Sequence, residues 1–258
     1  MRNSVFSLIV LILVVFLSAC ETKNKYEGPS PVDLMIRDLS NEPTFSIILF
    51  DMQLDESKGL YQHKYRVKTN IEDSTSQPKT TDWVDVSESF FAENMENMGL
   101  ELASKSSDGT VHKIPAPPGF NTAVGNPKYG EWRNDNSGNS FWAFYGQYAF
   151  MSTMFNMMYG PPLYRSTYTH YNNYRSNPST GSQPYRGTGR NTYGTNSPVT
   201  KSSNPNFFQR KQQQTALSSF KQKVASNPSR YTRRSSTVGR SNSRTGYSSR
   251  SRGSSFGK

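Results

Sequence analysis

The chain has 258 residues, a formal net charge of +11 and 33% hydrophobic residues. A single cysteine excludes an internal disulfide framework, and His63, His112 and His170 are not spaced as metal ligands. The sequence contains no Gly-rich phosphate loop, and no catalytic triad can be proposed from it. We therefore predict a protein that is not an enzyme and that holds no cofactor or metal.

The charge is divided sharply along the chain. Residues 21–160 carry 12 Lys and Arg against 19 Asp and Glu, whereas residues 161–258 carry 17 Lys and Arg and no acidic residue. Such asymmetry usually marks a folded part joined to a basic tail. The two parts are therefore expected to differ in structure and in partners.

The first twenty residues have the features of an export signal. Arg2 precedes an uncharged apolar stretch, and two small residues stand directly before Cys20. The apolar stretch is shorter than the ~20 residues that a membrane-spanning helix needs. The pattern predicts a signal peptide over residues 1–19 that is removed before Cys20.

The quartet Leu17-Ser18-Ala19-Cys20 resembles the lipobox of bacterial lipoproteins. The resemblance covers residues 1–20 only. It implies that Cys20 carries lipid, becomes the first residue of the mature chain and holds the protein at a membrane surface. The next residue is Glu21 rather than the Asp that favours retention in the inner membrane, so the outer membrane is expected. An ordinary secretory signal or an uncleaved anchor are the alternatives, and either would still export the rest.

Residues 20–31 form a polar linker in this interpretation, and residues 32–115 form a small domain. Residues 44–52 are apolar on both alternating faces, which predicts a central strand covered on both sides. The alternation over residues 61–67 predicts a half-buried strand in a hairpin with it. His63 falls on the inward face of that strand and is expected to pack rather than to bind a ligand.

A short strand near residues 83–86 is followed by helical spacing that ends at Gly99. Asp85 and Glu88 resemble a capping box at the start of this helix. Asp108-Gly109 then predicts a hairpin turn. The expected fold class is α+β, with a small antiparallel sheet and one helix.

Acidic residues in and after this helix could be catalytic carboxylates or cation ligands. They lie along one polar face of the helix and just after its end, so we expect them to be solvated surface residues. They are Glu88, Glu93, Glu96 and Glu101. The alternative from another functional class is a membrane-anchored enzyme with an acidic site around Asp82, Asp85 and Glu88.

Residues 116–162 combine a Pro- and Gly-rich loop with an apolar aromatic and Met segment. The twenty residues 140–159 carry no charge and contain eight aromatic residues and four Met. As a helix, this segment must be buried by the domain, by a protein partner or by lipid. A membrane span and partial insertion into the interface are less favoured, because polar residues dilute the hydrophobicity.

Residues 163–258 are rich in Ser, Arg and Tyr and contain almost no aliphatic residue, so we expect a disordered basic tail. Residues 207–224 are the part expected to form a short helix on contact with a partner. Because the chain is exported, the expected partners are anionic envelope polymers or lipids rather than intracellular nucleic acid. A solvated tail without a partner is the alternative.

These observations together indicate a non-enzymatic, lipid-anchored lipoprotein of the cell envelope. We expect the domain and the aromatic segment to bind a protein partner of the membrane, and the basic tail to engage anionic surfaces. A surface adhesin or matrix component is a further alternative.

Overall fold

The computed structural model describes residues 26–155, 162–189 and 191–213. The chain divides into two units, residues 1–211 and residues 212–258. The expected signal peptide, Cys20, the end of the apolar segment and residues 214–258 of the expected tail lie outside the described residues.

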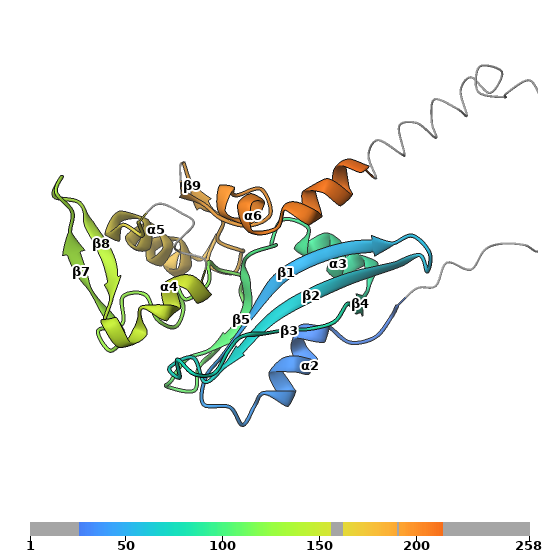
Figure 1. Ribbon diagram of the computed structural model, residues 1–258, viewed down its shortest axis with the longest axis horizontal. Helices are drawn as coiled ribbons and strands as arrows, with labels where there is room; N and C mark the ends of the chain where they lie inside the picture. Colours follow the sequence, from blue (N-terminus) through green and yellow to red (C-terminus); the bar gives the residue numbers. More distant parts are fainter. Residues whose placement is uncertain (1–25, 156–161, 190, 214–258) are drawn as a thin grey trace, which may run out of the picture. The chain divides into compact units, whose positions relative to one another are not determined.

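An antiparallel sheet of six strands forms the first half of the described chain, in the order β3-β2-β1-β5-β6 with β4 also paired to β2 (Figure 1). The strands are β1 (Phe45–Asp55), β2 (Leu60–Thr69), β3 (Lys79–Thr80), β4 (Val84–Val86), β5 (Glu101–Lys105) and β6 (Val111–His112). The long strand β1 lies in the middle of this order, and its first five residues are buried, as the apolar run predicts. The α+β class is therefore confirmed.

Two helices, α2 (Pro31–Asp38) and α3 (Glu88–Asn94), pack against the main core cluster of the sheet. The sequence predicts only the second of them. Helix α3 is capped by Ser87, whose hydroxyl accepts a hydrogen bond from the Phe90 amide at 3.2 Å. The expected capping box of Asp85 and Glu88 is therefore wrong, because Asp85 belongs to β4 and accepts instead from the Gln62 amide at 2.8 Å.

The second half of the described chain is built from short elements with aromatic side chains between them. They are the hairpin of β7 (Gly130–Asn134) and β8 (Ser140–Phe144), η1 (Gly146–Tyr148), α4 (Phe150–Met154), α5 (Arg165–Ser176), the pair β9 (Gly187–Thr188) and β10 (Asn191–Thr192), and α6 (Pro198–Ser203). Residues 205–213 are also helical. Two core clusters lie among these elements, one around Met151 and the other around Tyr171, while Phe207 and Phe208 pack against the main core cluster of the sheet.

The expected helix over residues 140–159 is wrong in its first part, because residues 140–144 form strand β8. Trp142 lies opposite Trp132 in the hairpin, and their rings meet edge to face at 5.1 Å. A tight turn closes the hairpin at Gly138, whose φ of 82° suits glycine. Aromatic residues favour strands when a partner strand is present, and this partner lies in the segment expected to be a loop.

The expected disorder of residues 163–258 is also wrong for the described residues up to 211. Tyr171 is 4% exposed and Tyr185 is 1% exposed, and their rings meet at 5.2 Å. Tyrosine rings here bury the apolar area that aliphatic residues supply in most cores. Counting aliphatic residues therefore underestimates the capacity of this segment to fold.

The described part of the chain contains no helix with the length and hydropathy needed to cross a membrane.

Candidate functional site

The acidic residues of the alternative enzyme site do not come together as a reactive group. Asp85 bonds to Gln62, and Glu88 lies 3.5 Å from the Tyr61 hydroxyl, while Asp82 is exposed before β4. Within the described ranges, no three His, Cys, Asp or Glu side chains are grouped so that they could hold a metal ion. The arrangement is that of carboxylates bonded to neutral neighbours on a strand and a helix start.

His63 is fully buried on β2, on the inward face that the alternation predicts. Its Nδ1 lies 3.1 Å from the Tyr65 hydroxyl, and the Phe90 and Phe91 rings lie 5.6 and 5.3 Å away. Burial lowers the pKa of His63 to about 3, so the ring stays neutral. Its position is that of a core side chain.

Glu101 corrects the expectation of a solvated acidic face. This residue is 1% exposed, because it lies on β5, which pairs with the central strand β1, and not on a helix surface. Its Oε2 accepts from the Ser46 hydroxyl at 2.6 Å and from the Gly119 backbone amide at 3.5 Å. Burial raises the pKa of Glu101 to about 7, and hydrogen bonds from Ser46, Ser104, Gly119 and Asn121 oppose that rise.

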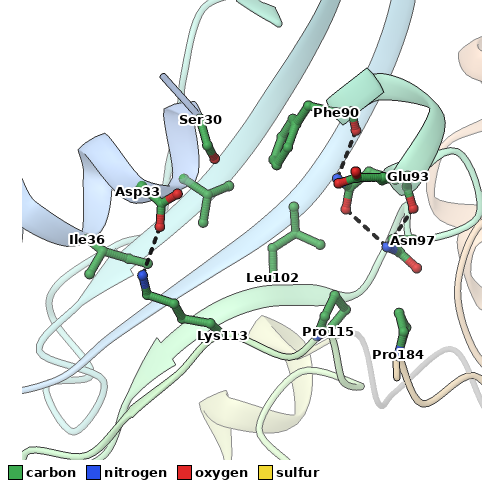
Figure 2. Close-up of a pocket in the computed structure, with 12 residues that line it drawn as sticks. Ser30, Asp33, Ile36, Phe90, Glu93, Asn97, Leu102, Lys113, Pro115 and Pro184 are labelled. Atoms are coloured by element: carbon green, nitrogen blue, oxygen red, sulfur yellow. Dashed lines mark hydrogen bonds and ion pairs between the residues drawn. The ribbon is translucent and has the colours of Figure 1, made fainter. Parts of the chain in front are cut away.

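A first hollow of about 330 Å³ lies over the sheet between α2, α3 and β5 (Figure 2). Its apolar lining includes Val32, Phe90 and Leu102. On one side Asp33 and Lys113 form an ion pair at 2.9 Å. On the other side the side-chain amide of Asn97 donates a hydrogen bond to the side-chain oxygen of Asn94 at 3.0 Å. The hollow thus has an apolar floor and a rim whose polar groups already bond to one another.

A second hollow of about 430 Å³, here called the α5 pocket, lies between α5 and the residues of and after β6. Its polar lining residues are His112, Lys113, Asn121, Tyr168, Tyr171, Asn172 and Arg175. The Tyr171 hydroxyl donates to the Asn121 side-chain oxygen. Phe120 meets Tyr171 edge to face at 5.2 Å and supplies part of the apolar wall.

Arg175 fixes one wall of the α5 pocket, because all five of its N–H donors bond to neutral oxygens. Its Nε donates to the Tyr171 hydroxyl at 3.3 Å. Its two terminal nitrogens donate to four backbone carbonyls, at distances from 3.0 to 3.1 Å, and these belong to Ile114, Pro115, Gly181 and Gln183. The planar guanidinium therefore joins α5 to the segment after β6 and to the loop before β9.

No family model, curated protein or solved structure matches this chain. The sequence predicts neither Glu101 as a buried group nor the α5 pocket. Glu101 follows a helix by a few residues, which suggests solvent, and the pocket joins residues far apart in the sequence. The one signal for the pocket in the sequence is the spacing of Tyr and Arg over residues 164–175. From the sequence alone, this spacing indicates part of the expected basic tail.

Proposed function

We propose that this protein is a non-enzymatic lipoprotein of the cell envelope, anchored by lipid on Cys20 and held to anionic surfaces by its C-terminal segment. The observation that carries the proposal is the segregation of charge. Residues 212–258 contain ten Lys and Arg and no Asp or Glu. A segment whose charges are all positive gains about 1 kcal/mol of binding free energy for each Lys or Arg that lies near an anionic membrane surface.

The N-terminal sequence supports the anchored location. The stretch that ends in Leu17-Ser18-Ala19-Cys20 resembles a lipobox, and Glu21 favours the outer membrane. Each methylene of a buried acyl chain adds about 0.8 kcal/mol, so the chains of a mature lipoprotein give stable attachment. A body fixed in this way keeps its basic segment close to the envelope polymers.

The folded part supports the assignment of surface binding to residues 212–258 rather than to the whole range 163–258. Several of the arginines before residue 212 bond to other parts of the fold. Arg186 donates to Asn97 at 3.0 Å, and Arg210 lies 2.6 Å from Asp51. Arg175 likewise donates hydrogen bonds to backbone carbonyls of the fold. These cations contribute to folding, whereas residues 212–258 have no acidic residue of their own to offset their charge.

The test compares binding of the mature chain and of a chain lacking residues 212–258 to phosphatidylglycerol vesicles. Both carry Cys20→Ala so that lipid does not contribute. We expect binding that requires residues 212–258 and largely disappears between about 0.1 and 1 M salt, because the Debye length falls from about 10 to 3 Å. A composition-matched scramble of residues 212–258 is the control and should bind equally. Equal binding by the shortened chain, or tight binding at high salt, would contradict the proposal.

A further inference from the structure

The α5 pocket is lined by positive and neutral groups without a carboxylate. Lys113 and Arg175 supply the charge, and His112, which directly precedes Lys113 in the sequence, also lines the pocket. Lys113 forms an ion pair with Asp33 at the neighbouring hollow, but both side chains are more than half exposed, so that pair is weak and its ammonium can turn toward a ligand. The lining therefore favours a ligand with negative charge.

The charge on Arg175 has no carboxylate counter-ion among the described residues. All five of its N–H donors bond to four carbonyls and one hydroxyl. These neutral acceptors satisfy its hydrogen-bonding capacity but do not neutralise its positive charge. The side chain is partly buried, so water screens this charge less than it screens an exposed one. Its effect reaches the pocket: the pKa of His112 is lowered mainly by burial, Asp108 opposes the decrease, and Arg175 adds to it.

The remaining lining groups suit a hydroxylated ring. Asn172 supplies a side-chain amide, Tyr168 supplies a phenol group, and Phe120 provides an apolar wall, whereas the Tyr171 hydroxyl and Asn121 already bond to each other. Amides and hydroxyls both donate and accept hydrogen bonds, as a ring with several hydroxyl groups requires. The volume of about 430 Å³ lies within the range of small-ligand sites.

We propose that the α5 pocket binds an anionic sugar unit, a hydroxylated ring that carries a carboxylate or a phosphate. The cations at Lys113 and Arg175 attract the acid group, and the exposed amide of Asn172 bonds to the hydroxyl groups. This site goes beyond the proposed function, because it requires neither lipid on Cys20 nor residues 212–258. It would select one kind of sugar unit, whereas the basic segment responds to charge alone.

The test is calorimetric titration of the mature chain, with Cys20→Ala, at about 0.15 M salt. The probes are glucuronate, glucose 6-phosphate, neutral methyl glucoside and inorganic phosphate. We expect saturable binding of glucuronate or glucose 6-phosphate, about ten-fold tighter than that of methyl glucoside or inorganic phosphate. The first two probes decide whether the acid group is a carboxylate or a phosphate.

Matched variants place the binding in the pocket. Lys113→Ala and Asn172→Ala should each weaken binding about five-fold or more, and both residues are exposed, so the fold should persist. Lys128→Ala, which removes another ion-paired lysine, and Asn173→Ala, on the same helix outside the pocket, should leave it unchanged. All four variants keep residues 212–258, so binding by that segment is the same in each.

Three results would overturn the proposal. The first is that neither acidic sugar binds saturably up to about 10 mM. The second is that inorganic phosphate binds as tightly as glucose 6-phosphate. The third is that neither Lys113→Ala nor Asn172→Ala weakens the binding. None of these results bears on the vesicle experiment, so the failure of one proposal can be told from the failure of the other.

Discussion

Glu101 shows how one residue can make the stability of this protein depend on pH. Its carboxyl is buried on β5, and no described cation pairs with it. Burial raises the pKa of this group from 4.5 to about 7, so the folded protein keeps a proton that the unfolded chain releases. The stability contributed by that proton is fully present below about pH 4.5 and is lost as the pH rises through about 7.

Replacing this carboxyl tests the dependence directly. Glu101→Gln removes the titrating group and keeps its shape, so above pH 7 the variant should be more stable than the natural chain, by roughly 3 kcal/mol at most. Below about pH 4.5 that advantage should disappear, because both side chains are then neutral. Urea unfolding at several pH values between about 4.5 and 8 measures the difference.

The control for this experiment is Glu93→Gln, which changes an exposed carboxyl of α3. That variant should keep the pH dependence of the natural chain. If Glu101→Gln keeps it as well, Glu101 is not the group responsible. The sequence alone does not predict this role, because the partner Ser46 lies 55 residues away and Glu101 follows the predicted helix by only a few residues.

At the scale of elements, Arg175 adds a set of hydrogen bonds to the packing of Tyr171 that attaches α5 to the rest of the fold. Arg175→Lys keeps the charge but offers three donors in place of the five that now serve the hydroxyl of Tyr171 and four carbonyls. We expect a loss of roughly 2 kcal/mol in the free energy of unfolding, and faster amide exchange along α5. Hydrogen exchange measured by mass spectrometry provides the second readout.

Arg133→Lys is the matched substitution, because Arg133 also bonds to a nearby oxygen but lies on the exposed hairpin strand β7. It should change stability by no more than about 0.5 kcal/mol. Equal exchange rates along α5 in the natural chain and in Arg175→Lys would show that this arginine does not hold the helix. Rapid exchange along α5 in the natural chain would restore the sequence-based expectation of disorder.

The elements that could be predicted from sequence are those with local periodic signals. The apolar run of β1, the alternation of β2 and the helical spacing of α3 each identify their element within a few residues. The hairpin of β7 and β8 was missed because its stability depends on the pairing of Trp132 with Trp142 across a turn. The site residues were missed for the same reason, since the α5 pocket brings together positions more than 50 residues apart.

At the scale of the whole molecule, the two proposed attachments to the envelope differ in their physical basis. Lipid on Cys20 would act through apolar transfer, which salt does not weaken. Residues 212–258 would act through exposed charge, which salt screens. Because both belong to one chain, each raises the local concentration of the other at the surface.

This difference predicts the behaviour of three variants in cell membranes washed with salt. The natural chain and a chain lacking residues 212–258 should both stay in the membrane fraction at about 1 M salt, because the lipid remains. Cys20→Ala should lose fatty-acid labelling and leave the membrane fraction at high salt, while part of it stays bound at low salt through charge. Combining both changes should release the protein at every salt concentration. Labelling that persists in Cys20→Ala would contradict the lipobox assignment, and fractionation of the natural chain with inner-membrane markers would contradict the sorting expected from Glu21.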